Sequence, residues 1–344
     1  MVLLRPWARP ISTAAQRLNY AFAFDIDGVL IKGKRTIPQA NKALRLLNGD
    51  NPRQRKVPFV LLTNGGGMTE ASKAEQISDM VGVKIDPDQV IMSHSPMQAL
   101  AKKYKERRVL VVGGKGDACT RLAQGYGFEK VVTPNDVHLW NTSLWPYSQP
   151  TGEPRVNVDF SKEPVEAVMV FHDSYDWGRD LQTTLDAVCS QDGIMTTTKS
   201  DFSTQTMPLY FSNNDLVWST DYPVNRLGQG GFKVALEGLY HTLTGQPLQS
   251  TSYGKPHGTT YAFAEQVISR QVQRQTGQVY VPTHVYAIGD NPAADIKGAN
   301  AHGWSSILVK SGVFKGPGNS PLYPADHVCD NVLDAVQWAL AQEE

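Results

Sequence analysis

The chain has 344 residues, of which 41% are hydrophobic and 19% are charged, and its formal net charge is zero. This length allows two domains with sizeable cores, and the balanced charge argues against a nucleic-acid partner. The three cysteines are far apart and form no Cys-x-x-Cys pair, which argues against a disulfide framework or a zinc site. No apolar run approaches the roughly 18 residues of a membrane-spanning helix, so we expect no transmembrane segment.

The first 24 residues contain three arginines and no acidic residue. A basic segment with hydroxyl groups and no acids is typical of a mitochondrial presequence. Pro6 and Pro10 weaken this interpretation because proline interrupts helix interiors. We expect residues 1–19 to be a mitochondrial presequence, or alternatively a disordered basic tail on a cytoplasmic protein.

The uncharged run Tyr20–Phe24 predicts a buried strand, and Asp25 and Asp27 follow where that strand ends. Alternation along an extended chain places both carboxylates on the same side, and Gly28 allows the backbone to turn away. Two acids at the end of a central strand are costly to bury unless a metal ion or a reaction needs them. The alternative is a strand that ends in a solvated aspartate turn.

A second buried strand, Phe59–Leu62, leads into the turn Thr63–Gly67, whose sequence is Thr-Asn-Gly-Gly-Gly. A helix is predicted over 69–80, so this turn exposes backbone N–H groups at the start of a helix. Such an arrangement suits an oxyanion. The same pattern is also compatible with an ordinary strand-to-helix turn.

The strand Val109–Val112 is followed by Gly113–Gly116, which resembles a dinucleotide-binding turn. The match is poor because Cys119 stands where glycine or alanine is expected. A dinucleotide-binding oxidoreductase is nevertheless a competing hypothesis. Residues 135–163 show no periodic pattern and predict a long irregular loop or insertion.

Two further strands are predicted, at 167–171 and 209–211. The second ends in a polar turn that contains Asn213 and Asp215. A glycine-rich segment then begins a helix that extends to about residue 243. The chain therefore continues to alternate strands with helices.

Lys255 lies between glycine and proline, just before another predicted helix, although a lone lysine is more often solvated. The strand His284–Ile288 leads into Gly-Asp290, and Asp295 lies at the start of the next helix, where an acid is favoured. One more strand at 306–309 and a closing helix complete the chain.

Alternation of strands and helices predicts an α/β fold with a doubly wound parallel sheet. In such sheets the active site lies beyond the carboxyl ends of the strands. Polar groups stand at corresponding places near four strand ends: Asp25 with Asp27, Thr63 with Asn64, Lys255, and Asp290 with Asp295. We therefore expect these groups to meet at one edge of the sheet.

With these four motifs in this order, the chain resembles the haloacid dehalogenase (HAD) superfamily of aspartate-nucleophile phosphohydrolases. The long insert between the second and third motifs resembles the C2 cap of subfamily IIA, the NagD-like and p-nitrophenyl-phosphatase-like group. The nearest resemblance is to the mitochondrial branch related to the cat eye syndrome critical region protein 5. It implies a Rossmann-like HAD core over residues 20–89 and 228–344, with an inserted α/β C2-type cap over 90–227.

The resemblance implies that Asp25 attacks phosphorus and carries an aspartyl-phosphate, while Asp27 serves as acid and base. It implies Mg²⁺ as the cofactor, a hard cation suited to carboxylate and phosphate oxygens. Asp25 and Asp290 would be side-chain ligands, Asp27 would give its backbone carbonyl, and Asp295 would orient the metal shell. Because the family's dehalogenases lack an acid at the place of Asp27, the chain is expected to be a phosphatase.

The resemblance also implies that Thr63, Asn64 and Gly65 hold the phosphoryl oxygens. Lys255 would neutralise charge around the nucleophile and the transferring group. The expected substrate is therefore a small phosphorylated metabolite. A non-catalytic phosphate-ester-binding or scaffold protein with the same fold is the alternative.

The expected cap would choose the substrate, with Asn213 and Asp215 as candidate substrate residues and His172 and Asp173 as weaker ones. A plain strand-end turn is at least as compatible with each of them. Some fungal relatives look fused to a CDP-alcohol phosphatidyltransferase-like domain, which suggests a link to glycerophospholipid metabolism. Caps of this group often mediate dimers, so a homodimer through the cap is also expected.

Overall fold

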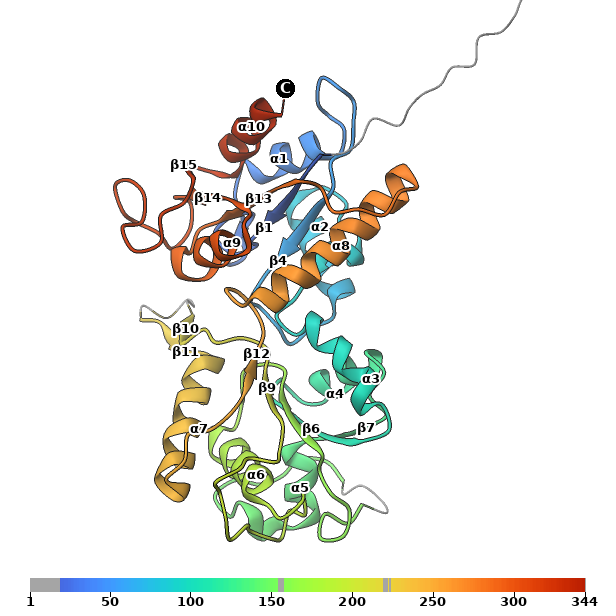
Figure 1. The fold of residues 1–344 in the computed structure, drawn as a ribbon, viewed down its shortest axis with the longest axis vertical. Helices are drawn as coiled ribbons and strands as arrows, with labels where there is room; N and C mark the ends of the chain where they lie inside the picture. The colour runs from blue at the N-terminus through green and yellow to red at the C-terminus, as the bar shows by residue number, and fades with distance from the viewer. Residues whose placement is uncertain (1–18, 154–157, 219–221, 223, 344) are drawn as a thin grey trace, which may run out of the picture.

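The computed structural model describes residues 19–153, 158–218, 222 and 224–343. Within these ranges the chain forms two α/β lobes, one above the other in Figure 1, and each is built on its own parallel sheet. The expected presequence or tail at 1–19 falls almost wholly on residues 1–18, outside the described residues. No described helix has both the length and the apolar character needed to cross a membrane.

The first lobe contains a parallel sheet whose strand order is β15-β14-β13-β1-β4-β5. Its strands are β1 (Tyr20–Phe24), β4 (Phe59–Leu62), β5 (Val90–Ile91), β13 (His284–Gly289), β14 (Ser305–Val309) and β15 (His327–Cys329). Strand β1 is central, because Phe22 pairs with Tyr286 on one side and with Phe59 on the other. The predicted doubly wound parallel sheet is thus confirmed.

Side-chain alternation in this sheet makes two cores. Phe22 and Phe24 face a core covered by α1 (Ala40–Leu47), α2 (Glu70–Val81) and α10 (Val332–Gln342). Ala21 and Ala23 face the other core, which α8 (Gly258–Thr276) and α9 (Lys297–His302) cover. Because both faces are covered, the central strands β1 and β4 consist of aromatic and aliphatic residues.

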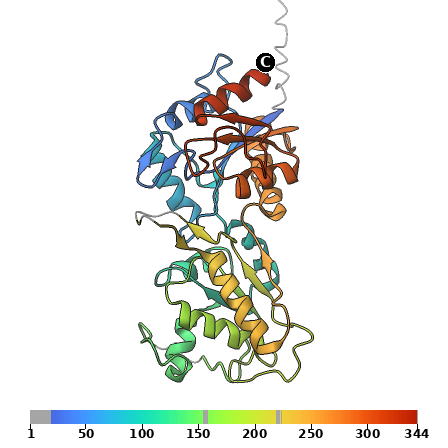
Figure 2. The same cartoon turned by 90° about the vertical axis from the view of Figure 1, so that its left-hand side faces the viewer.

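The second lobe contains a parallel sheet whose strand order is β12-β9-β8-β6-β7. Its strands are β6 (Arg108–Val112), β7 (Lys130–Val132), β8 (Ala167–Val170), β9 (Leu209–Phe211) and β12 (Thr251–Ser252). One face packs against α5 (Pro134–Trp140), α6 (Trp177–Cys189) and α7 (Gln229–Thr244), and Figure 2 shows α7 running along this lobe. The other face packs against α3 (Ala101–Tyr104) and α4 (Ala118–Gly125).

Short elements connect these layers. Two hairpins join β2 (Ile31–Lys32) to β3 (Arg35–Thr36) and β10 (Val217–Trp218) to β11 (Arg226–Leu227). The helical turns are η1 (Pro87–Gln89), η2 (Ser95–Leu100), η3 (Thr142–Leu144) and the π-turn η4 (Pro292–Ile296).

Strand pairing moves both expected boundaries of the insert. Strand β5, at the expected start at residue 90, pairs with β4 in the first sheet. Helix α7 and strand β12, beyond the expected end at residue 227, pack with the second sheet. The second lobe therefore extends from about residue 95 to about residue 253, and the chain passes between the lobes at 92–95 and 253–255.

The segment 135–163 was expected to be irregular, but part of it is helical. Helix α5 begins just before it, at Pro134 with Thr133 as its N-cap, and extends into it as far as Trp140. Thr133 Oγ1 accepts a hydrogen bond from Asp136 N, and the Asp136 carboxylate accepts one from Thr133 N at 2.7 Å. This capping box, with Pro134 at the first helical position, is a sequence signal that periodicity alone did not reveal.

Helix α8 is tied to the edge of β4 by Gln271, which is buried. Its Oε1 accepts a hydrogen bond from Phe59 N at 3.2 Å, and its Nε2 donates to Phe59 O at 3.0 Å. We predict that Gln271→Met lowers the free energy of unfolding by about 2 kcal/mol, because it leaves a buried N–H without a partner. Urea unfolding beside Gln273→Met, an exposed site on the same helix, tests this, and equal midpoints for both variants would contradict it.

Candidate active site

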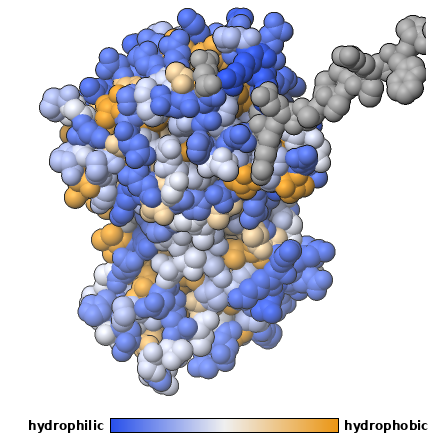
Figure 3. Space-filling model, turned by 45° about the horizontal axis from the view of Figure 1, so that its top comes forward, coloured by the Kyte–Doolittle hydropathy of each residue, from blue (hydrophilic) through white to orange (hydrophobic). Residues whose placement is uncertain are grey.

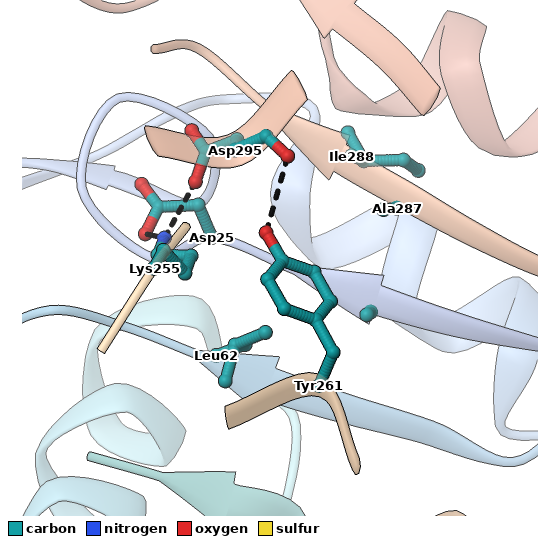
Figure 4. Close-up of a pocket in the computed structure, with 8 residues that line it drawn as sticks. Asp25, Leu62, Lys255, Tyr261, Ala287, Ile288 and Asp295 are labelled. Carbon is teal, nitrogen blue, oxygen red and sulfur yellow. Dashed lines mark hydrogen bonds and ion pairs between the residues drawn. The ribbon is translucent and has the colours of Figure 1, made fainter. Parts of the chain in front are cut away.

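Lys255 lies at the centre of the site, where the chain returns from the second lobe to the first. Its side chain is buried, and Nζ lies 2.5 Å from Asp25 Oδ1 and 2.6 Å from Asp295 Oδ1 (Figure 4). Burial alone would lower the pKa of Lys255, but the two carboxylates outweigh burial and raise its pKa well above the ordinary value. The lysine is therefore a fixed positive charge between two acids, which excludes the alternative of a solvated surface lysine.

Asp25 follows the central strand β1 and faces the carboxylates that follow β13. Carboxylate oxygens of Asp25, Asp290 and Asp295 all lie within 4.8 Å of one another. Burial and the neighbouring acids raise the pKa of Asp25 despite Lys255, and burial and Asp295 raise the pKa of Asp290 to about 6. One lysine does not balance three acids, and an all-oxygen set of this kind fits a hard divalent cation.

Asp290 is held by a loop that the sequence analysis did not assign to the site. Val313 N donates a hydrogen bond to Asp290 Oδ2 at 2.6 Å, and Ser311 Oγ donates to Gly28 O at 2.7 Å. A Cβ on Gly28 or on Gly312 would overlap the Asp290 carboxylate. The position of this loop in the chain could have placed it in the site, because it follows β14, whose carboxyl end lies at the same edge of the sheet.

Asp295 is fixed by the π-turn at the start of its helix. Its Oδ2 accepts hydrogen bonds from Asp290 N at 3.1 Å and Asn291 N at 2.9 Å, while Oδ1 contacts Lys255. Tyr261 Oη donates to the Asp295 backbone carbonyl at 3.2 Å and lines a small pocket behind the carboxylates, as Figure 4 shows. Both oxygens of Asp295 are thus engaged, which suits an orienting role.

The glycine-rich turn after β4 lies at the same sheet edge. Thr63 is buried, its N–H donates to Ile91 O at 3.0 Å, and its Oγ1 accepts from Gly65 N at 2.9 Å. Glycine at 65 keeps this turn open, because a Cβ there would lie 3.2 Å from Thr63 Oγ1. A hydroxyl and a compact turn beside Asp25 could bind phosphoryl oxygens.

Asn64 joins the turn to the lysine and to the second lobe. Its Oδ1 accepts from Lys255 N at 2.7 Å, and its Nδ2 donates to Lys255 O at 3.0 Å. Nδ2 also lies 3.1 Å from Asp215 Oδ1, and Asn213 Nδ2 donates to Asn64 O at 3.1 Å. The two candidate substrate residues therefore meet the first lobe at Asn64, whose side chain serves these contacts.

Asp27 lies apart from the buried carboxylates. Its side chain is exposed, and it is outside the metal-ligating group of side chains found among the described residues. Gly28 N donates to Ile31 O at 2.6 Å, so the backbone turns directly after Asp27. The Asp27 side chain is therefore open to solvent, whereas that of Asp25 is almost wholly shielded from it.

The glycine turn at 113–116 belongs to the second lobe and packs against the residues that follow β8. Gly114 N donates to Asp173 O at 2.9 Å, and a Cβ on Gly113 would overlap the His172 carbonyl. This backbone N–H is therefore already used in packing against the end of β8. The turn therefore has fewer free backbone N–H donors for a pyrophosphate than its sequence indicated.

Comparison with known proteins gives two matching family models and two close curated relatives. Residues 22–129 match the model described as haloacid dehalogenase-like hydrolase, and residues 252–335 match one described as HAD-hydrolase-like. A mitochondrial hydrolase of Saccharomyces cerevisiae is 38% identical over 93% of this chain and 95% of its own length. A Schizosaccharomyces pombe fusion of cardiolipin synthase (CMP-forming) with a mitochondrial hydrolase is 40% identical over 98% of this chain. The match spans only 56% of that fusion protein.

Solved structures share the fold at lower identity. A p-nitrophenyl phosphatase from Archaeoglobus fulgidus is 16% identical, with a TM-score of 0.59 over 94% of this chain and 99% of its own. A glycerol phosphate phosphatase from Mycobacterium tuberculosis, in complex with magnesium, is 20% identical. Its TM-score is 0.61 over 93% of this chain and 77% of its own.

The close packing of Gly312 against Asp290 allows a test of whether the carboxylate cluster binds a divalent cation. We predict that Gly312→Ala displaces the Asp290 side chain and weakens Mg²⁺ or Mn²⁺ binding at least about tenfold, as loss of ligand-orienting contacts does elsewhere. Gly318→Ala is the matched control, because a Cβ at that site meets nothing within 4 Å. Calorimetric titration measures both, and unchanged cation binding in Gly312→Ala would contradict the assignment.

Proposed function

The chain belongs to the haloacid dehalogenase-like hydrolases, and we propose that it is a Mg²⁺-dependent phosphatase acting on a small phosphomonoester. Its fold is that of the p-nitrophenyl-phosphatase and NagD-like members. The observation that carries the proposal is the buried contact of Lys255 with Asp25 and Asp295, beside Asp290. A nucleophilic carboxylate, a fixed cation and further oxygen ligands are what phosphoryl transfer to aspartate requires.

In the first step a carboxylate oxygen of Asp25 bonds to phosphorus, and the bond from phosphorus to the substrate's alcohol oxygen breaks. Protonated Asp27, exposed at the mouth of the site, gives its proton to that oxygen, so the alcohol leaves neutral. Lys255 stays against Asp25 and offsets the charge that repels a phosphate. The Thr63 hydroxyl and the N–H groups of Asn64 and Gly65 would hold the phosphoryl oxygens, and the Gly65 N–H would give up its hydrogen bond to Thr63 Oγ1 when phosphate binds.

In the second step the Asp27 carboxylate takes a proton from water, and the water oxygen bonds to phosphorus. The bond from phosphorus to Asp25 breaks, which releases inorganic phosphate and restores both acids. Asp25, Asp290 and the Asp27 backbone carbonyl would hold Mg²⁺, with Asp295 orienting the ligands, and the bound cation would shield the carboxylate from the phosphate charge.

The second lobe is the proposed cap. Its residues Asn213 and Asp215 reach Asn64, which also holds Lys255, so this lobe covers the mouth of the site. Burial raises the pKa of Asp215, and its side-chain hydrogen bond from Asn64 opposes that shift. These two cap residues are well placed to contact the alcohol part of a substrate.

A glycerol-phosphate-type substrate linked to glycerophospholipid metabolism is our proposal for the substrate class. Two comparisons support it: the relative fused to a cardiolipin synthase and the structural neighbour that hydrolyses glycerol phosphate. Both yeast relatives are named mitochondrial hydrolases, which supports a mitochondrial location for this protein. Import of a fluorescent fusion of the full chain into mitochondria, or its retention in the cytoplasm, decides the location.

We also propose that two copies pair through the cap. The hairpin β10–β11 and the adjoining start of α7 expose Leu216, Val217, Trp218, Tyr222, Val224, Leu227 and Val234. Figure 3 shows apolar surface at the left of the waist between the lobes, where Figure 1 places this hairpin. A two-stranded hairpin with open edges can pair with its own copy, and exposed apolar groups of this kind mark interaction sites.

We predict that the protein sediments as a dimer and that Trp218→Ser with Leu227→Ser shifts it to the monomer, because both side chains would lose a buried contact. The exposed pair Val279→Ser with Val281→Ser, on the first lobe, is the control. A monomeric wild-type protein at tens of micromolar would contradict the pairing.

We predict that Asp25→Asn lowers phosphate release by at least about three orders of magnitude, because an amide cannot replace the attacking carboxylate. The assay uses p-nitrophenyl phosphate and a panel of glycerol and sugar phosphates, with Mg²⁺ and with EDTA. Asp79→Asn, an exposed acid on α2, is the control and keeps full activity. Normal turnover by Asp25→Asn would refute the nucleophile, and no turnover by wild type would favour a non-catalytic phosphate-binding protein.

A further inference from the structure

Glu70 is the first residue of α2 and follows the turn that carries Thr63 and Gly65. Two hydroxyl groups donate hydrogen bonds to the same oxygen, Glu70 Oε1, namely Tyr126 Oη and, at 2.5 Å, Ser95 Oγ. Tyr126 belongs to the second lobe, and Ser95 lies where the chain first passes between the lobes. None of the four motifs accounts for this contact.

The hydrogen bonds around Glu70 have a fixed direction. Burial and the Glu70 carboxylate raise the pKa of Tyr126, so its hydroxyl keeps its proton and donates to Glu70. His94 Nδ1 lies 2.8 Å from Tyr126 Oη and must therefore be the donor to it. Burial lowers the pKa of His94 to about 4, which leaves a neutral ring with one N–H for this bond.

Ser95 is oriented in the same way. Its Oγ accepts a hydrogen bond from Met92 N at 2.8 Å, and its own proton is directed to Glu70. Two directed paths of donors therefore end on one carboxylate oxygen, one from His94 through Tyr126 and one from Met92 N through Ser95. Such a network holds its members in one arrangement, because any rotation breaks a bond in partly buried surroundings.

Packing extends this contact to the turn itself. The His94 ring stacks on Phe171 with centroids 6.1 Å apart, and Phe171 is followed by His172. A Cβ on Gly66 would lie 3.1 Å from His172 Nδ1, and one on Gly67 would overlap the same ring. The second lobe thus contacts the turn at its glycines and again at Glu70, just after its end.

We propose that Glu70 is a positioning residue, which couples the phosphate-binding turn to the cap through Tyr126 and Ser95. The physical reason is that the turn binds a phosphoryl group by backbone N–H groups, whose positions depend on the first turn of α2. Misplacement of binding groups by about 1 Å costs up to ~100-fold in rate. That the turn binds a phosphoryl group rests on the proposed phosphatase function, whereas the coupling of the turn to the cap does not depend on it.

The test compares Glu70→Gln and Tyr126→Phe with two controls. Tyr104→Phe removes another cap hydroxyl, paired with Tyr210 Oη at 3.1 Å, and Glu75→Gln changes an exposed carboxylate on the same helix. Inorganic phosphate is titrated as an inhibitor of p-nitrophenyl phosphate hydrolysis, well below the unfolding temperature. We expect its inhibition constant and KM to rise roughly fivefold in both test variants, and neither control to change.

The variant with both substitutions provides a further criterion. The effects of Glu70→Gln and Tyr126→Phe do not add if both remove the same hydrogen bond, because effects at contacting sites are not additive. In that case the double variant binds phosphate about as weakly as the single variant that binds it more weakly. A purely structural role would lower Tm and the active fraction, while phosphate inhibition and KM stayed at wild-type values. That result would overturn the inference and leave the proposed function intact.

Amide hydrogen exchange over residues 63–69 is a readout that does not depend on catalysis. We expect faster exchange there in Tyr126→Phe and Glu70→Gln, and wild-type exchange in both controls. If the wild-type protein neither hydrolyses nor binds phosphate, the proposed function fails, and exchange alone decides the coupling. Unchanged exchange in the test variants would refute it.

Discussion

The ion pairs of one buried lysine are the constraint on which the rest of the structure depends. Lys255 can stay charged in the interior only because Asp25 and Asp295, which follow the neighbouring parallel strands β1 and β13, both contact it. Removing one partner from such a buried group costs about 3–5 kcal/mol, so each member of the cluster requires the others. Asn64 secures the lysine backbone on both sides, which ties the nucleophile, the glycine turn and the returning chain into one unit.

The same unit explains how two lobes make one site. Each crossing of the chain between the lobes carries a polar group that bonds to the segment from the turn after β4 to the start of α2. The first crossing supplies Ser95 to Glu70, and the second supplies the backbone of Lys255 to Asn64. The proposed substrate selection by the cap and the proposed phosphate binding by the core therefore share a short segment, residues 63–70. A change in cap position has to be transmitted to that segment.

The cluster of Asp25, Lys255, Asp290 and Asp295 could be predicted from the sequence because its signals are local. Apolar runs that stop at Asp25, Thr63 and Asp290 identify strand ends, and parallel strands bring their carboxyl ends to one edge. The loop at Ser311 to Val313 and the Glu70 contact could not be found in this way. Their partners lie far away in the chain, and no spacing rule links Glu70 to Tyr126. The predicted boundaries of the insert differ from those in the structure for a similar reason, since only strand pairing assigns β5 to the first sheet and β12 to the second.

Detection of the covalent intermediate tests the central claim most directly. The wild-type enzyme, mixed with a good phosphomonoester and Mg²⁺, is quenched in acid during turnover, and its peptides are analysed by mass spectrometry. The account predicts one phosphoryl group on the peptide containing Asp25, labile to hydroxylamine as an acyl phosphate is, and absent when EDTA replaces Mg²⁺. A phosphoryl group on any other residue, or rapid turnover without labelling of Asp25, would contradict it.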